Sequence, residues 1–192
     1  MKSILEPEER ENFYIKLYFG NSSDLEMAGI RKAYLDFNRT LKIPEDSNQK
    51  DRQEKRDNKR SKTELFLKKE LQALIKSECL TQKDFDLLHK KLCKRLITEW
   101  NELSFGQAQK WINMSLKYWL LLGDSRVMGI EKNALFFHMP IDGIIQERFF
   151  GKNLPPWSQI NSYEDYFKYQ IDFRKNNIGK VAIVEEFKEF NK

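Results

Sequence analysis

Apolar residues recur at helical spacing along most of this chain, and this spacing constrains the fold more than any other feature. One series has five apolar side chains at steps of three or four residues: Phe85, Leu88, Leu92, Leu96 and Trp100. Such steps place side chains on one face of a helix. Strand-like alternation is nearly absent, and the 192 residues include only 8 Gly and 5 Pro, too few for a turn-rich β protein. We therefore predict an all-α fold.

A stretch without apolar side chains divides the chain. Residues 45–62 are all polar or charged, so they cannot bury an apolar surface. We therefore divide the chain into three parts. These are an N-terminal helical extension over residues 1–44, a charged linker or solvated helix over residues 45–63, and a main all-α domain over residues 64–192.

Capping residues and helix breakers predict where the helices begin and end. Thr81 and Ser162 each stand three residues before an aspartate, the spacing of an N-terminal capping box. Gly123 and Pro44 end helices, and a polar turn at 20–23 interrupts one. The predicted helical segments are 8–41 with this interruption, 65–75, 85–100, 104–122, 140–150 and 163–174. The tail at 181–190 is compatible with a strand or a helix.

The segment 163–174 is rich in aromatic residues. Its helical spacing predicts an inward face made of the following residues: Tyr163, Tyr166, Phe167, Gln170 and Ile171. Tyr169 and Phe173 are then expected to point outward or toward a partner.

Composition excludes several classes of protein. The longest apolar run, Tyr118 to Leu122, is far shorter than the roughly 20 residues that cross a bilayer. The N-terminus turns acidic where a signal peptide would be apolar, so we expect a cytoplasmic protein without membrane contact. Two cysteines are too few for a disulfide framework. The potential zinc ligands do not match the spacing of a common zinc module, so we expect no metal and no other cofactor. They are Cys79, His89, Cys93 and His138.

Positive charge is concentrated in one part of the chain. Residues 50–95 hold 15 Lys and Arg residues against 8 Asp and Glu, whereas the whole chain has a net charge of +5. A basic segment of this kind can bind phosphate backbones. We therefore expect nucleic acid, in particular DNA, as a partner, with Arg52, Arg56 and Arg60 among the contacts. The alternative is a mixed-charge surface that serves solubility.

The segment from Leu103 to Met114 has the most specific pattern in the sequence. A turn of small residues, Gly106 and Ala108, enters a helix that has Lys110 near its start. Glycine allows another group to approach the backbone closely, and the free N–H groups of a helix N-terminus bind anions such as phosphate. Asp142 follows Pro140 at the start of the next predicted helix.

Residues 103–149 resemble the helix-hairpin-helix DNA glycosylases. The resemblance implies that Gly106 and Ala108 are hairpin positions against the DNA backbone, with Ala108 standing where the family has its second glycine. It further implies that Lys110 is the nucleophile and Asp142 its acidic partner, and that Trp111, Trp119 or Phe137 stacks on an extruded base. Residues 85–148 also resemble a small bacterial family of helical proteins, which supplies no activity.

Two functions remain open at this point. The first is a nucleic-acid-associated protein, including a divergent helix-hairpin-helix glycosylase. The second is a non-enzymatic helical protein that binds a protein partner. In a purely structural interpretation, Gly106 only begins a helix, Lys110 is solvated, and Asp142 is a helix N-terminal acid. The position of Lys110 relative to Asp142 and to a pocket distinguishes catalysis from these alternatives.

Overall fold

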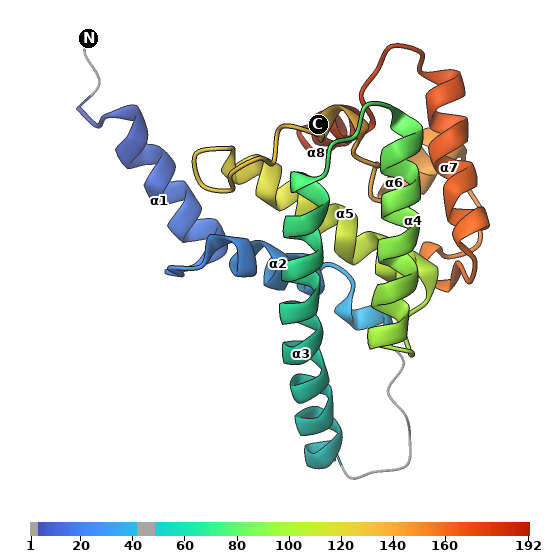
Figure 1. The fold of residues 1–192 in the computed structure, drawn as a ribbon, viewed down its shortest axis with the longest axis horizontal. Helices are drawn as coiled ribbons and strands as arrows, with labels where there is room; N and C mark the ends of the chain where they lie inside the picture. The colour runs from blue at the N-terminus through green and yellow to red at the C-terminus, as the bar shows by residue number, and fades with distance from the viewer. Residues whose placement is uncertain (1–3, 42–48) are drawn as a thin grey trace.

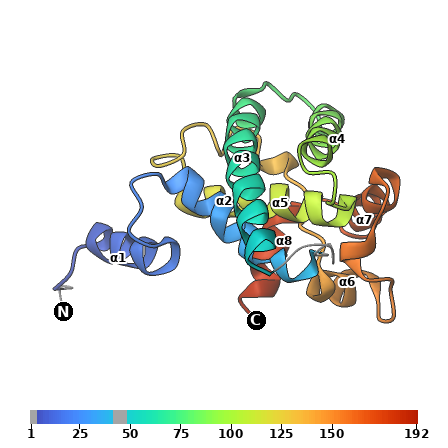
Figure 2. The same ribbon diagram turned by 90° about the horizontal axis from the view of Figure 1, so that it is seen from below.

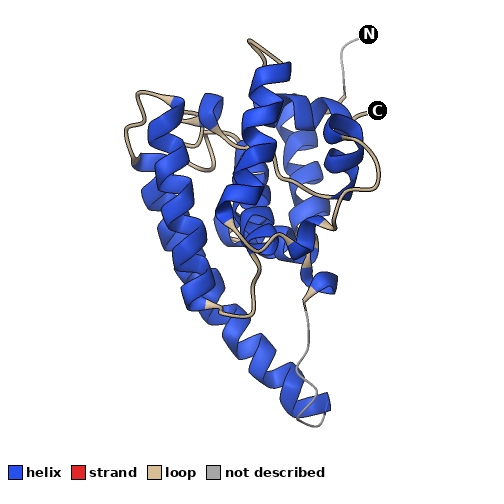
Figure 3. Cartoon of the chain, turned by 90° about the vertical axis from the view of Figure 1, so that its right-hand side faces the viewer, coloured by secondary structure: helices blue, strands red, loops and turns tan. Residues whose placement is uncertain are grey.

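The fold is all-α, as predicted. We describe it from a computed structural model that covers residues 4–41 and 49–192, the side chains of residues 49, 50 and 52 excepted. Within these residues the secondary structure is entirely helical (Figure 3). The α-helices are α1 (Pro7–Phe19), α2 (Leu25–Leu35), α3 (Gln49–Lys76), α4 (Gln82–Glu99), α5 (Phe105–Leu122), α6 (Gly143–Phe150), α7 (Tyr163–Asn176) and α8 (Ala182–Phe190). Three short 3-10 helices lie at Asn38–Thr40, Ala134–Phe136 and Trp157–Gln159.

Helix α5 is the centre of the fold. Every residue from Gly106 to Trp119 is buried, because the other helices pack around it on all sides (Figure 1). A helix buried on all sides must hold any charged side chain in the interior. Two lysines of α5, Lys110 and Lys117, are in this position.

Helix α2 packs on α5 more extensively than any other helix does. Two indole N–H groups of α5 donate to carbonyls of α2: Trp111 to Ile30 at 3.0 Å and Trp119 to Glu26 at 2.8 Å. Gly29 makes the close approach possible, since a Cβ there would lie 2.9 Å from Cδ1 of Trp119. Helix α2 therefore shares the apolar core with α5. The division at residues 44 and 63 stays a prediction.

The predicted helix ends are mostly confirmed. Thr81, Ser104 and Ser162 cap α4, α5 and α7 with their side chains, and Gly123 ends α5 with a positive φ of 75°. Helix α6 begins at Gly143, not at Pro140, because the Asp142 side chain accepts the Ile145 N–H and so forms the cap. The tail at 182–190 is a helix.

Two expectations from helical spacing are wrong. Phe173 is fully buried against Phe149, with ring centroids 5.4 Å apart, and Ile171 is exposed. The buried positions of α7 are 163, 166, 170 and 173, a narrower stripe than predicted.

Helix α2 ends at Leu35 and is followed by a 3-10 turn, whereas the predicted segment continued to residue 41. The predicted break at Pro44 lies outside the described residues.

Helices α1 and α3 extend away from the core. The N-terminal half of α3, which includes residues 49–62 of the apolar-free stretch, projects beyond the other helices (Figure 3). Helix α1 stands apart from the main body (Figure 2) and has no buried residue. Among the described residues, none of the helices combines the length and the apolar character needed to span a bilayer.

Candidate nucleic-acid interface

Helices α3 and α4 lie side by side along one edge of the molecule (Figure 2). Arg95 of α4 joins them, because it pairs with Glu70 of α3 and lies over the ring of Phe66 at 5.4 Å. Each of the two helices also has solvent-exposed residues on a face away from this contact. The basic segment 50–95 includes both of these faces.

The three arginines predicted to contact DNA do not form one exposed group. Arg56 donates to the Tyr34 hydroxyl and to the Asn38 carbonyl, both at 2.9 Å, so it holds α3 against the segment after α2. Arg60 pairs with buried Glu64 at 2.6 Å. The Arg52 side chain lies outside the described residues. The role of all three in DNA binding stays a prediction, and two of them already have partners within the protein.

Four lysines of α3 lie in a row on its solvent face at intervals of seven residues: Lys55, Lys62, Lys69 and Lys76. Seven residues are nearly two helical turns, so these side chains emerge on the same side of the helix. Each residue is exposed, and within the described part of the chain no carboxylate lies at ion-pair distance from any of these ammonium groups.

The exposed face of α4 adds Lys83, Lys91 and Lys94, which likewise have no ion-pair partner among the described residues. We call the seven lysines together the basic face. It consists of Lys55, Lys62, Lys69 and Lys76 of α3 with Lys83, Lys91 and Lys94 of α4.

Two of the three acidic residues between Lys55 and Lys76 are paired with arginines, and the third, Asp57, meets a neutral amide. Glu64 is buried between Arg31 and Arg60, and Glu70 pairs with Arg95. Asp57 accepts a hydrogen bond from the Gln53 amide at 3.0 Å. The basic face therefore carries seven positive charges without an ion pair in the described residues, although Asp84 and Glu164 are near enough to interact electrostatically with Lys83 and Lys94. The other described basic residues of α3 and α4 have polar partners within the protein.

The structure brings Lys110 and Asp142 together. The Lys110 ammonium lies 2.5 Å from Oδ2 of Asp142, while Oδ1 of the same carboxylate accepts the Ile145 N–H and caps α6. Lys110 is only 3% exposed, and the Asp142 side chain is 23% exposed. The pair therefore fixes the N-terminus of α6 on the central helix α5. The Asp142 carboxylate compensates the positive charge of the Lys110 ammonium, which is shielded from solvent.

Gly106, Ala108 and Trp111 are all buried. The Gly106 N–H donates to the Ile160 carbonyl at 3.0 Å, and a Cβ at this position would lie 1.8 Å from the Trp157 carbonyl oxygen. In this conformation the segment 157–160 covers the start of α5 at Gly106, and a nucleic acid would reach this part of the helix only if that segment moved away. The assignment of Gly106, Ala108 and Trp111 to DNA binding stays a prediction.

Two hollows flank the loop 151–157. The larger, of about 620 Å³, lies between Phe150 and Tyr169, and the smaller, of about 450 Å³, is lined by Gly143 and Trp157. Gly143, which follows Asp142 in the sequence, lines the smaller hollow. Neither Lys110 nor Asp142 lines either of the two.

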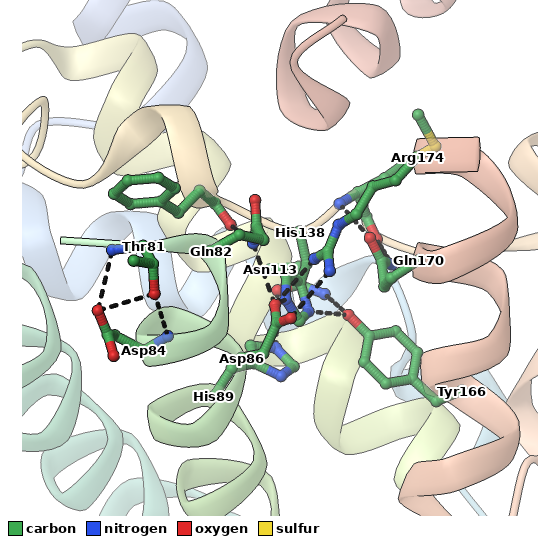
Figure 4. A network of polar contacts seen from close by, with 12 residues as sticks. Thr81, Gln82, Asp84, Asp86, His89, Asn113, His138, Tyr166, Gln170 and Arg174 are labelled. Atoms are coloured by element: carbon green, nitrogen blue, oxygen red, sulfur yellow. Dashed lines mark hydrogen bonds and ion pairs between the residues drawn. The ribbon is translucent and has the colours of Figure 1, made fainter. Parts of the chain in front are cut away.

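A buried polar network connects α4, α5, α7 and the segment before α6 (Figure 4). Asp86 of α4 accepts a hydrogen bond from His138 Nε2 at 2.7 Å and two from the Arg174 guanidinium at 2.8 and 2.9 Å. The other ring nitrogen of His138 bonds the Tyr166 hydroxyl at 2.8 Å. Asn113 donates to that hydroxyl at 2.9 Å.

The network continues to the second histidine. The Asn113 carbonyl oxygen can only accept, so His89 Nε2 carries a proton and donates to it at 3.0 Å. His89 Nδ1 then accepts, and its neighbours are the Tyr163 hydroxyl at 3.0 Å and the Cys93 thiol at 3.7 Å. Each polar group named here has a partner, so the network fixes the packing of four elements.

Burial sets the protonation states in this network. It lowers the pKa of both histidines, His89 well below the usual value, which favours neutral imidazoles. Burial alone would raise the pKa of Asp86, but the hydrogen bonds from His138 and Arg174 outweigh it and hold this pKa well below its usual range. Burial also raises the pKa of the Cys93 thiol. The described residues contain no group of three or more His, Cys, Asp or Glu side chains that could hold a metal ion.

A second buried ion pair lies two turns along α5 from the first. The Lys117 ammonium lies 2.7 Å from Oε1 and 2.6 Å from Oε2 of Glu186 on α8, with both side chains almost fully buried. It also lies 5.0 Å from the ring centre of Phe187 and 4.7 Å from that of Phe190. Burial raises the pKa of the Glu186 carboxyl, and the nearby Lys117 charge opposes this effect.

Comparison with known proteins gives no relative from which a function could be transferred. No protein-family model matches the chain, and neither curated proteins nor solved structures give a match. The functional argument therefore depends on the side chains of this chain alone.

Proposed function

We propose that this protein associates with nucleic acid through the basic face of α3 and α4. The supporting observation is the row of four exposed lysines at seven-residue intervals on α3, with no carboxylate at ion-pair distance in the described residues. Phosphate groups would replace the small counterions around these lysines, and the release of counterions favours binding. This proposal does not require the buried start of α5 to be accessible.

Replacing Lys55, Lys62, Lys69 and Lys76 together with glutamine tests this proposal. Each phosphate contact contributes about fivefold to affinity at 0.15 M salt, so losing four should weaken binding by up to about a thousandfold. Fluorescence anisotropy with a labelled 20-base-pair duplex, measured across a salt series, gives both the affinity and the salt slope. The fold should be unaffected, because glutamine is a good helix former and all four positions are exposed.

A matched control removes the same charge elsewhere. Lys152, Lys175, Lys180 and Lys188 lie on or beside α6, α7 and α8 and are all exposed. Their combined replacement with glutamine should change the affinity much less than the α3 variant does. Equal losses in the two variants would mean that only the net charge matters, which would contradict a localised interface.

Base excision is a second candidate, favoured by the 2.5 Å distance between Lys110 and Asp142. In this reaction Asp142 would accept a proton from Lys110, and the neutral amine would attack C1′ of the sugar. The base would leave with the electron pair of the glycosidic bond and take up a proton. Cleavage of the C1′–O4′ bond, with transfer of a proton from the attached nitrogen to O4′, would then open the ring and leave the sugar bound as an imine. This candidate ranks second because Lys110 is buried and lines neither hollow.

Borohydride reduction in the presence of a duplex with an abasic site tests the second candidate. If the reaction occurs, reduction traps a covalent adduct with the wild type, and Lys110→Gln removes it. Asp142→Asn should slow trapping; asparagine still caps α6, but buried Lys110 loses its counter-charge, so circular dichroism must show that the variant is folded. Absence of an adduct from the folded wild-type protein would reject base excision and leave the binding proposal unaffected.

A further inference from the structure

We infer that the ligand of the basic face is a duplex nucleic acid, bound through its phosphates without reading the base sequence. This inference rests on the proposed function and specifies the class of nucleic acid. Three features of the basic face support it: its length, its lack of stacking side chains, and its residue types.

The lysine row is nearly as long as one turn of a duplex. From Lys55 to Lys76 the row spans 21 residues of a continuous helix, which is about 31 Å at 1.5 Å per residue. A duplex of this length holds roughly nine base pairs, at 3.4 Å per pair. Because α3 is one helix, the positive charges are held in a line and match a rigid polyanion better than a flexible one.

The basic face offers no platform for unpaired bases. Proteins that bind single strands stack successive bases on exposed aromatic side chains. In the described parts of α3 and α4, Phe66 is covered by the Arg95 guanidinium, and Phe85 and Trp100 are buried. The exposed aromatic residues of α1, Phe13 and Tyr14, are on a helix that lies away from this edge (Figure 2).

The residue types of the basic face bind phosphates but do not distinguish bases. Base edges are read mainly by arginine, asparagine and glutamine, whose side chains form paired hydrogen bonds. The seven lysines that define the basic face act as single point charges, and Asn58 is the one exposed amide side chain that lies among them on α3. The arginines of the same helices, Arg56, Arg60 and Arg95, are engaged within the protein. Binding should therefore be independent of sequence.

The test compares wild-type protein on a 20-base-pair duplex, on one of its separated strands, and on a second duplex of unrelated sequence. With seven contacts, log affinity should fall with log salt at a slope near −6 for the duplex and near −5 for the strand. At 0.15 M salt the duplex should bind about tenfold tighter than the strand. The two duplexes should agree within about threefold.

Each other result contradicts a specific part of the argument. Equal or tighter binding of the single strand would reject this inference and leave the proposed function standing. A difference above tenfold between the two duplexes would reject sequence independence and with it this inference. If neither nucleic acid binds, the proposed function itself fails. Vesicles that contain 30% phosphatidylserine serve as a further probe, and binding to them alone would assign the basic face to a lipid surface and overturn both proposals.

Discussion

Replacing Trp111 with alanine should lower the free energy of unfolding by about 3–5 kcal/mol, the usual cost of removing a large buried aromatic side chain. Trp111 is fully buried in α5, and its ring lies 5.4 Å from those of Tyr34 and Phe37. The truncation would leave a cavity between α2 and α5 and remove the indole hydrogen bond to Ile30. Urea denaturation followed by circular dichroism measures the loss.

An exposed aromatic residue provides the control for this experiment. Phe13 on α1 is 62% exposed, so Phe13→Ala should change the free energy of unfolding by less than about 0.5 kcal/mol. A similarly small loss for Trp111→Ala would mean that Trp111 is accessible in solution. The stacking role implied by the resemblance to DNA glycosylases would then gain support at the expense of the packing described here.

The helix starts that depend on a capping side chain were predictable because they depend on local chemistry. The side chains of Thr81 and Ser162 accept hydrogen bonds from N–H groups in the first turns of α4 and α7, and these bonds need no other element. The position of Trp111 was predictable in part, since an aromatic residue at helical spacing is usually buried. Its partners on α2 were not predictable, because the contact between α2 and α5 joins residues about 80 positions apart.

The burial of Lys110 and Lys117 could not be predicted from spacing. Lysine is normally exposed, and a sequence pattern does not show which carboxylates approach from other helices. Asp142 is on α6 and Glu186 is on α8, and both reach α5 only through the tertiary fold. The buried polar network was missed for the same reason, because the sequence separations of His89 from Asn113 and of His138 from Asp86 follow no motif.

The basic face, by contrast, could have been predicted from the sequence, although the predicted DNA contacts were the arginines of the same helix. Arg56 and Arg60 share one face of α3 because they are four residues apart, and this face meets Tyr34, next to buried Glu64. The lysines at seven-residue intervals identify the opposite, solvent face. The apolar residues of the same helix show which side is buried and therefore which side is exposed. They are Leu67, Leu71, Leu74 and Ile75.

The buried pair of Lys117 and Glu186 leads to the second large effect. Lys117→Met should lower the free energy of unfolding by about 3–5 kcal/mol at pH 7, because it leaves Glu186 as an unpaired buried charge. The double variant Lys117→Met/Glu186→Leu should recover most of this loss, since the interior then holds neither charge. Lys188→Met on the exposed side of α8 is the control and should cost less than about 1 kcal/mol.

The loss in Lys117→Met should also depend on pH, with a sign that identifies its cause. Burial already raises the pKa of Glu186 above its usual value of 4.5, and removing Lys117 raises this pKa further. The folded variant therefore binds a proton that the unfolded chain still lacks, so its stability relative to wild type increases as pH falls from 7 toward 5. Urea denaturation of both proteins at pH 7, 6 and 5 measures the difference. A loss that is constant with pH and unchanged in the double variant would show that packing against Phe187 and Phe190, and not the charge of Glu186, explains the burial of Lys117.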